Sequence, residues 1–202
     1  EHGSFRNINH AIVDDIASGK DVYPYPRLLF NVFDHLDLDD IKVVILGQDP
    51  YINADLRTYK INNKDVTIKI PQAMGMSFSV PIGIKIPPSL NNIYKNQFRY
   101  NAIDTNQPLG NLQYWVDQGC FMMNTALTVR ENESGSHCEI WKQMTDKTIK
   151  HISTELNDVV VVLGGRPSFG KYSLIATNKH HIIVSSHPSG LSCSKPMGVR
   201  PA

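Results

Sequence analysis

The sequence has little of the features that mark several specialised classes of protein. Its 202 residues carry a formal net charge of only +1 and three cysteines, Cys120, Cys138 and Cys193. No apolar run approaches the roughly 20 residues that span a membrane, and we expect neither a signal peptide nor membrane association. An odd number of cysteines without metal-ligand spacing argues against a disulfide framework and a zinc site, and it indicates an intracellular, reducing compartment, whether nucleus or host cytoplasm.

The weak charge imbalance also limits how the chain could bind a polyanion. A basic surface is the usual footprint of nucleic-acid binding, and a net charge of +1 does not provide one. Any contact with nucleic acid must therefore be local to one face. With 41% hydrophobic and 19% charged residues, the chain can fold around one core as a single domain over residues 1–202, and we expect a monomer.

Apolar strands alternate with helical patterns along the chain. Short runs rich in Val, Ile, Leu and Met are typical of strands buried on both faces, and they occupy residues 43–46, 120–124, 159–163 and 182–185. Amphipathic or capped segments predict helices at residues 8–19, 28–33, 90–100, 111–118 and 139–156. This alternation predicts an α/β fold with a central four-stranded parallel sheet flanked by helices.

A short polar turn follows the first of these strands. Residues 47–51 read Gly-Gln-Asp-Pro-Tyr, and Pro50 restricts the backbone of Asp49 to extended geometry, which gives the carboxylate a set direction. Ligands bind at the carboxyl ends of strands in open α/β sheets, so this turn is a candidate site. The alternative is an ordinary turn in which Asp49 bonds nearby amides.

The other strand ends bring further polar side chains to the same edge of the sheet. Asn124 ends the second strand, Arg166 follows the third, and His187 and Ser189 follow the fourth. One acid and one histidine without an obvious nucleophilic Ser or Cys suit activation of a water and stabilisation of a leaving group. The amide of Asn124 can pair with the edge of a nucleobase.

Each of these side chains also has a purely structural interpretation. His187 could bond a backbone carbonyl, Asn124 could be a turn residue, and Phe78, which could stack on a base, could belong to the core. We expect Ser89 to cap the helix that begins at residue 90 and Ser189 to lie in a turn. Convergence of the side chains on one sheet edge favours the functional interpretation.

Five motifs carry a family resemblance. Residues 47–51, 75–80, 87–90, 124–129 and 187–192 resemble, in order and approximate spacing, the motif set of family 1 uracil-DNA glycosylases. The resemblance implies an enzyme of base excision repair that needs no metal or cofactor. Such an enzyme flips uracil out of single- or double-stranded DNA and hydrolyses its N-glycosidic bond, which leaves an abasic site. A proteinaceous uracil-DNA glycosylase inhibitor is a further candidate partner.

The resemblance implies a role for each motif residue. Asp49 would orient or deprotonate the attacking water, and neutral His187 would donate to uracil O2 as the uracil anion leaves. Asn124 would read uracil N3 and O4, and the ring of Phe78 would stack on the base. Tyr51 would exclude the methyl group of thymine, and Gln48 would help to hold the same pocket.

The DNA itself would contact residues outside that pocket. Leu191 would be a wedge that fills the gap left by the flipped nucleotide. The phosphate contacts implied by the resemblance are Ser89, Ser189 and Ser192, with Arg166 standing where the family has a serine. Neutral hydrogen bonds of this kind position a strand without reading its sequence, so we expect little preference beyond uracil.

The chain departs from the family pattern in places. Ile52 stands where histidine is usual, so a polar contact beside the water is missing or supplied elsewhere, and Gly190 in place of proline should loosen the Leu191 loop. The chain stops at Ala202, which predicts an apparently truncated C-terminus. Residues 52–73 are predicted to be an insertion beside the site.

This predicted insertion has the pattern of a β-hairpin. Residues 64–70 alternate like a strand, and Asn62 and Asn63 can form the turn before it. We favour a simple solvated hairpin over an added element that binds DNA or a partner.

Two further functions compete with uracil removal. The chain could be a catalytically weak or inactive homologue that acts as a DNA-binding replication accessory protein, or a relative that acts on mismatched or otherwise altered bases. The presence of Asp49, Asn124 and His187 together favours the enzyme, because a binding module has no evident need for all three.

Overall fold

The core of the molecule is a four-stranded parallel sheet with strand order β5-β2-β7-β8. The computed structural model describes residues 2–100 and 109–193. Its parallel strands are β2 (Val43–Gly47), β5 (Cys120–Asn124), β7 (Val160–Gly164) and β8 (His181–Ser185). The register places Gly47 beside Asn124, so these two strand ends lie at the same edge. The predicted α/β fold and its four strands are confirmed.

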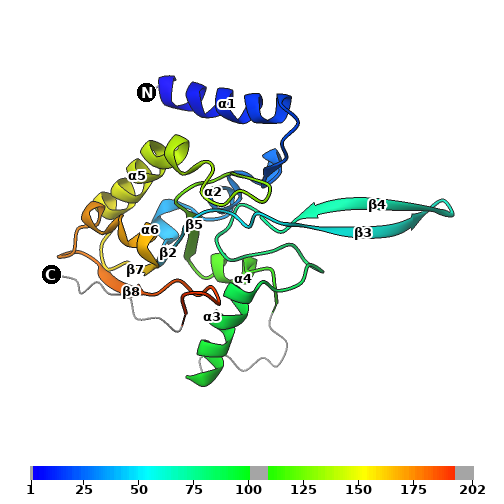
Figure 1. Cartoon of the computed structure of the whole chain (residues 1–202). Coiled ribbons are helices and arrows are strands. Elements are labelled where there is room, and N and C mark those ends of the chain that lie inside the picture. The colour runs from blue at the N-terminus through cyan, green and yellow to red at the C-terminus, as the bar shows by residue number, and fades with distance from the viewer. Residues whose placement is uncertain (1, 101–108, 194–202) are drawn as a thin grey trace.

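Helices cover both faces of this sheet (Figure 1). Val44 and Val161 face α5 (Cys138–Glu155), where they line a small apolar hollow together with Ile149 and Ile152. The alternate strand positions, such as Ile45, face α3 (Pro88–Arg99) and α4 (Gln113–Val116). Because both faces are covered, the strands read as continuous apolar runs. The outer strand β8 is the exception: it is half-exposed in alternation, because it forms an edge of the sheet.

The amino-terminal helix α1 (His2–Ala17) lies across α5 (Figure 1). Helical periodicity groups Ile8 and Ile16 on one apolar face of the helix predicted at residues 8–19, but only Ile8 is buried, and Ile16 is 51% exposed. Asp15 takes the inward position at this end of the helix, because it forms an ion pair with Arg130 and a hydrogen bond with His137. Hydrophobic periodicity alone could not predict that a carboxylate would displace an isoleucine from the interface.

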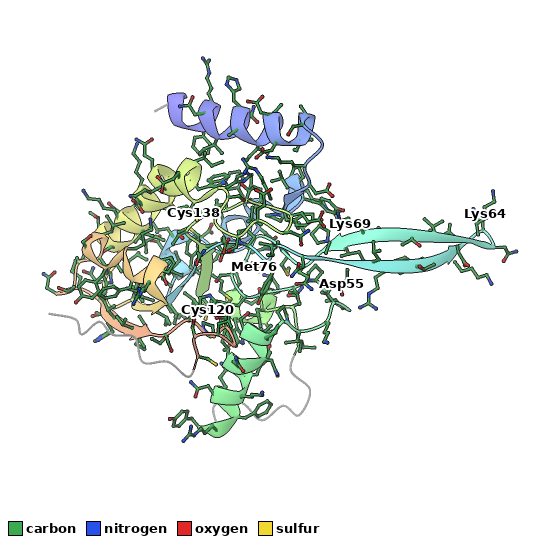
Figure 2. The ribbon with its side chains drawn as sticks, in the orientation of Figure 1. Asp55, Lys64, Lys69, Met76, Cys120 and Cys138 are labelled. Atoms are coloured by element: carbon green, nitrogen blue, oxygen red, sulfur yellow. The ribbon has the colours of Figure 1, made fainter. Side chains whose placement is uncertain are left out.

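Residues 52–73 form an arm that extends from the body of the molecule. Strands β3 (Ala54–Ile61) and β4 (Lys64–Pro71) pair antiparallel along their whole length. Asn62 and Asn63 both have positive φ, 50° and 61°, as a two-residue hairpin turn requires. Figure 2 shows Lys64 at the far tip of this arm, with Lys69 close to its base. The predicted hairpin and its turn are confirmed.

Other local predictions were inexact. Ser89 does not cap α3: the cap position is Pro87, and Ser89 lies buried in the first turn. A two-stranded ribbon of β1 (Val22–Tyr23) and β6 (Val129–Arg130) was not predicted, because strands of this length have no periodicity to detect. The remaining elements are α2 (Asn31–Asp34), α6 (Arg166–Phe169), and three short 3₁₀ turns at Pro26–Leu28, Leu38–Asp40 and Tyr172–Leu174.

No helix within residues 2–100 and 109–193 is long and apolar enough to cross a membrane.

Candidate active site

A cavity of about 180 Å³ opens where β2 and β5 end. It is lined by the predicted residues Gln48, Asp49, Tyr51, Phe78, Ser89, Asn124 and His187, together with Gly47, Pro50, Ile52, Ala73, Met74, Gly75, Met76 and Ser134. The structure therefore brings together seven residues that the sequence singled out, drawn from segments as far apart as residues 48 and 187.

Asp49 lies half-buried at the cavity wall, held by a loop that follows β6. The hydroxyl of Ser134 donates to Asp49 Oδ2 at 2.8 Å, and the backbone amide of Gly135 donates to the same oxygen at 2.6 Å. Both donors are more than eighty residues away in sequence. Asp49 is thus fixed by tertiary contacts and not by the local turn that was the structural alternative.

His187 approaches the cavity from the end of β8. The amide of Ser189 donates to His187 Nδ1 at 3.1 Å, so Nδ1 is an acceptor and the ring proton resides on Nε2. Burial lowers the pKa of His187, and the negative charge of Asp49 only partly opposes this effect. The imidazole is therefore neutral at physiological pH and presents an N–H donor.

Close packing fixes the backbone around this histidine. A Cβ on Gly165, which has φ +89°, would lie 2.8 Å from His187 Cβ. Asn92 on α3 donates to the carbonyl of Pro188 at 2.9 Å and ties the loop to that helix. Both contacts restrict the position of the imidazole relative to Asp49.

Tyr51 and Phe78 line the cavity and are joined by a hydrogen bond. The Tyr51 hydroxyl donates to the carbonyl of Phe78 at 3.2 Å and shares a hydrogen bond with Ser89 Oγ at 2.9 Å. Burial raises the pKa of Tyr51 to about 12, so this side chain stays a neutral phenol. Phe78 has a positive φ of 63°, and its ring centroid lies 5.9 Å from that of His187. This is a strained conformation for a bulky residue, and the half-buried ring both lines the cavity and packs against the core.

Asn124 fits its position because its neighbour on β2 is a glycine. A Cβ on Gly47 would lie 2.2 Å from Asn124 Oδ1. The adjoining backbone is fixed by the hydroxyl of Thr125 and the amide of Ala126, which donate to the carbonyl of Gln48 at 2.8 and 3.0 Å. Asn124 is 7% exposed and lines the cavity, and its amide oxygen occupies the space that a side chain at position 47 would need.

The predicted DNA-contacting residues divide into two groups. Leu191 is 82% exposed and Arg166 is also exposed, while Ser189 and Ser192 are half-buried and are joined by a backbone turn hydrogen bond. Ser89 differs, because it is only 7% exposed and is engaged by Tyr51. Its position places it in the wall of the pocket, and its predicted phosphate contact stays a prediction.

Sequence reasoning missed Ser134 and Gly135. Residues 134–136 read Ser-Gly-Ser, which is the composition of an ordinary turn. Nothing in the local pattern connects these residues to Asp49, since their proximity depends on how the segment after β6 returns to the end of β2.

Comparison with known proteins gives a consistent result. The model of the uracil DNA glycosylase superfamily matches residues 33–200. The uracil-DNA glycosylase of Borrelia duttonii (strain Ly) is 44% identical over 192 residues, which cover 94% of this chain and 78% of that protein. The crystal structure of mimivirus uracil-DNA glycosylase superposes with a TM-score of 0.85 at 36% identity, covering 98% of this chain and 69% of that one.

A second mimivirus structure is a variant of UNG in complex with UGI. It superposes with a TM-score of 0.83 at 37% identity and covers 93% of this chain. The chain spans 65% of the length of that mimivirus protein. The family predicted from the five motifs is confirmed, because a superfamily model matches most of the chain and relatives share about two fifths of its residues: this chain belongs to the uracil-DNA glycosylase superfamily.

Proposed function

We propose that this protein captures a uracil nucleotide turned out of DNA and hydrolyses its N-glycosidic bond, leaving free uracil and an abasic site. The observation that carries the proposal is the convergence of Asp49, Asn124 and His187 on one cavity in a member of this superfamily. The target bond is not reachable inside a stacked duplex, so the nucleotide must leave the helix before it reacts.

Asp49 acts on the water and on the sugar. Its carboxylate orients a water toward C1′ and opposes the positive charge that develops on the sugar as the bond to the base lengthens. The water oxygen forms a bond to C1′, the bond from C1′ to N1 breaks, and its electron pair leaves on the base. The proton released by the water passes to Asp49 or to solvent through it.

His187 stabilises the departing base. Its Nε2–H donates to uracil O2, where the negative charge of the leaving anion accumulates. Two observations support this role: the Ser189 amide occupies Nδ1, and burial keeps the ring neutral. The reaction as proposed uses a water, a carboxylate and a neutral donor, and it invokes no metal or cofactor.

The cavity wall selects the base. Asn124 pairs with N3 and O4 of uracil, Phe78 stacks on the ring, and Gln48 holds the adjoining backbone. Tyr51 excludes the methyl group of thymine. This gate is supported by the two hydrogen bonds that fix its hydroxyl and by its burial, which prevent the ring from moving aside at low cost.

The DNA strand lies across the exposed loops beside the cavity. Leu191 enters the gap left by the flipped nucleotide, and Ser89, Ser189, Ser192 and Arg166 contact phosphates. A proteinaceous inhibitor of uracil-DNA glycosylases is a further proposed partner, which is supported by the complex of the mimivirus UNG variant with UGI. The protein works as a monomer, since one chain supplies every residue of the proposed site.

The test is release of uracil from a single-stranded oligonucleotide that carries one deoxyuridine, with a chelator present. We expect the wild-type protein to release uracil. Asp49→Asn and His187→Leu should each lower turnover by about 10²–10⁴-fold while DNA affinity changes little. Asp39→Asn is the matched control, because it makes the same chemical change at an exposed position away from the cavity.

Each outcome is decisive for a different part of the proposal. Wild-type rates in both active-site variants would refute the assigned roles. Absence of uracil release by the wild-type protein, together with tight DNA binding, would instead support a DNA-binding accessory protein.

A further inference from the structure

We propose that Ser134 is a positioning residue that fixes the orientation of the Asp49 carboxylate. Ser134 Oγ and the Gly135 amide approach the same carboxylate oxygen, Oδ2, at 2.8 and 2.6 Å. Hydrogen bonds to a charged acceptor are roughly twice as strong as neutral ones, so the pair forms a specific clamp. The inference rests on the proposed catalytic role of Asp49.

The clamp matters because a carboxylate rotates easily. The terminal torsion of an aspartate has a broad, nearly two-fold energy profile, so the side chain alone does not decide which oxygen faces the cavity. Because both donors bond Oδ2, that oxygen faces the loop of residues 130–137 and its hydrogen bonds are made within the protein. Among the residues that the structure describes, no protein group donates to Oδ1, which leaves this oxygen available to a water.

Residues 130–137, here called the bracing loop, are anchored at the carboxyl-terminal end. His137 is buried, and its Nε2 lies 2.8 Å from Asp15 Oδ2 while its Nδ1 lies 2.7 Å from Thr128 Oγ1. Trp141 donates to the same threonine hydroxyl at 2.6 Å. This chain of bonds fixes the end of the bracing loop to helix α1 and to the core.

Charge strengthens the attachment to α1. Arg130 Nε donates to Asp15 Oδ2 at 2.7 Å, so the first and last residues of the bracing loop meet at one carboxylate. Burial alone would raise the pKa of Asp15, but the hydrogen bonds from Arg130 and His137 outweigh that effect and lower the pKa to about 2. Asp15 is therefore ionised under all physiological conditions.

Lys69, near the base of the β3–β4 hairpin, holds the amino-terminal end of the bracing loop. Lys69 Nζ lies 2.7 Å from Glu131 Oε2 and 2.6 Å from Asp21 Oδ2, and Tyr23 donates to the other oxygen of Glu131 at 2.9 Å. Within the bracing loop, the amide of Arg130 donates to Ser136 Oγ at 2.9 Å. Ser134 is exposed, yet the loop that carries it is fixed on both sides.

The Ser134 hydroxyl contributes to the reaction by keeping the Asp49 carboxylate in one orientation. Its position is determined when the protein folds, so no ordering is needed when substrate binds. Loss of the hydroxyl should leave the uracil pocket intact, because none of the base-contacting residues bonds to Ser134. The expected deficit therefore lies in the chemical step and not in binding.

The first experiment is the steady-state kinetics of Ser134→Ala with the single-deoxyuridine oligonucleotide. We expect kcat to fall about tenfold with KM unchanged, since one charge-assisted hydrogen bond is removed while the Gly135 amide still donates. Ser134→Thr keeps the hydroxyl and should restore kcat to within about twofold of the wild-type value. Thr154→Ala removes an exposed hydroxyl on α5, far from the cavity, and serves as the control.

The second experiment asks whether Ser134 acts through Asp49. In an Asp49→Ala background, adding Ser134→Ala should have no further effect on kcat, because the carboxylate that it positions is absent. The same tenfold loss in that background would overturn the proposal, as would a wild-type kcat for Ser134→Ala. Failure of the proposed function would look different, because the wild-type protein itself would then release no uracil, whereas a fully active Asp49→Asn would refute only the role of Asp49.

Discussion

The two β-structures that flank the active-site turn are built in opposite ways. The parallel sheet has five-residue strands between layers of helices, and its Leu46 is fully buried. The hairpin has eight-residue strands that no helix of the described residues covers (Figure 1), and its Leu56 is 71% exposed. Asp49 lies in the segment between them. The difference indicates that the parallel sheet determines where the site forms, while the hairpin adds surface beyond it.

The hairpin nevertheless has a consistent internal pattern. Cross-strand pairing places Tyr59, Ile61, Val66 and Ile68 on one face, all at least 39% exposed. The opposite face includes a hydrogen bond between Thr58 and Thr67 at 2.9 Å. Such ribbons are marginally stable alone, so the attachment of Lys69 at the stem explains why this one keeps a defined position.

The sharpest test of this contrast replaces one leucine in each structure. Leu46→Ala should lower the free energy of unfolding by about 2–5 kcal/mol, because it opens a cavity in a packed core. Leu56→Ala should change it by no more than about 0.5 kcal/mol. Urea denaturation of both variants measures the two values. Equal destabilisation would mean that the hairpin is an integral part of the folded core.

The two regions should also differ in their response to pH. The proposed donor role requires a neutral His187, so the contribution of this residue to uracil release should be complete at neutral pH. It should disappear as the pH falls through the pKa of His187, which burial places below the value of about 6.5 typical of histidine. Titration of the imidazole signal by NMR, assigned with His187→Leu, measures that pKa directly. A raised pKa would contradict the neutral-donor role, whereas the hairpin should show no transition in this range.

The smallest effect is expected from shortening the hairpin. Replacing residues 58–67 by Asn-Gly keeps the Lys69 attachment and ends the ribbon at the Arg57–Ile68 pair. This pair is of the same type, in the alternation of antiparallel pairs, as the Ile61–Lys64 pair that now flanks the turn, so a two-residue turn fits there too. We expect kcat/KM on single-stranded substrate to stay within about threefold of wild type. A large rise in KM would instead identify the hairpin as a DNA-binding element, the alternative that the sequence left open.

The sequence predicted well those elements whose burial leaves a pattern of apolar residues, above all the four strands of the parallel sheet. The four strands appear as apolar runs, and the right-handed crossover rule places their carboxyl ends at one edge. Asp49, Asn124 and His187 could therefore be assigned to one site without coordinates. Their individual roles remain proposals that the kinetic variants test.

Interactions set by tertiary packing could not be predicted. Ser134 belongs to a turn of ordinary composition. On α1, Asp15 is buried against the body of the molecule, where helical periodicity would place Ile16. The isoleucine at position 52 is informative here, because its side chain offers no polar group to the cavity. Sequence left open whether another residue provides one, and the donors at Ser134 and Gly135 now bond Asp49 in the same cavity.

One backbone hydrogen bond at the base of the hairpin has an evolutionary consequence. The amide of Gln72 donates to the carbonyl of Asn53 at 3.0 Å. The chain therefore leaves the body and returns to it at two neighbouring residues that are joined by a hydrogen bond. Residues added to or removed from the arm in matched pairs would alter its reach without moving either end. Natural selection can therefore vary the length and surface of this arm independently of the chemistry performed beside it.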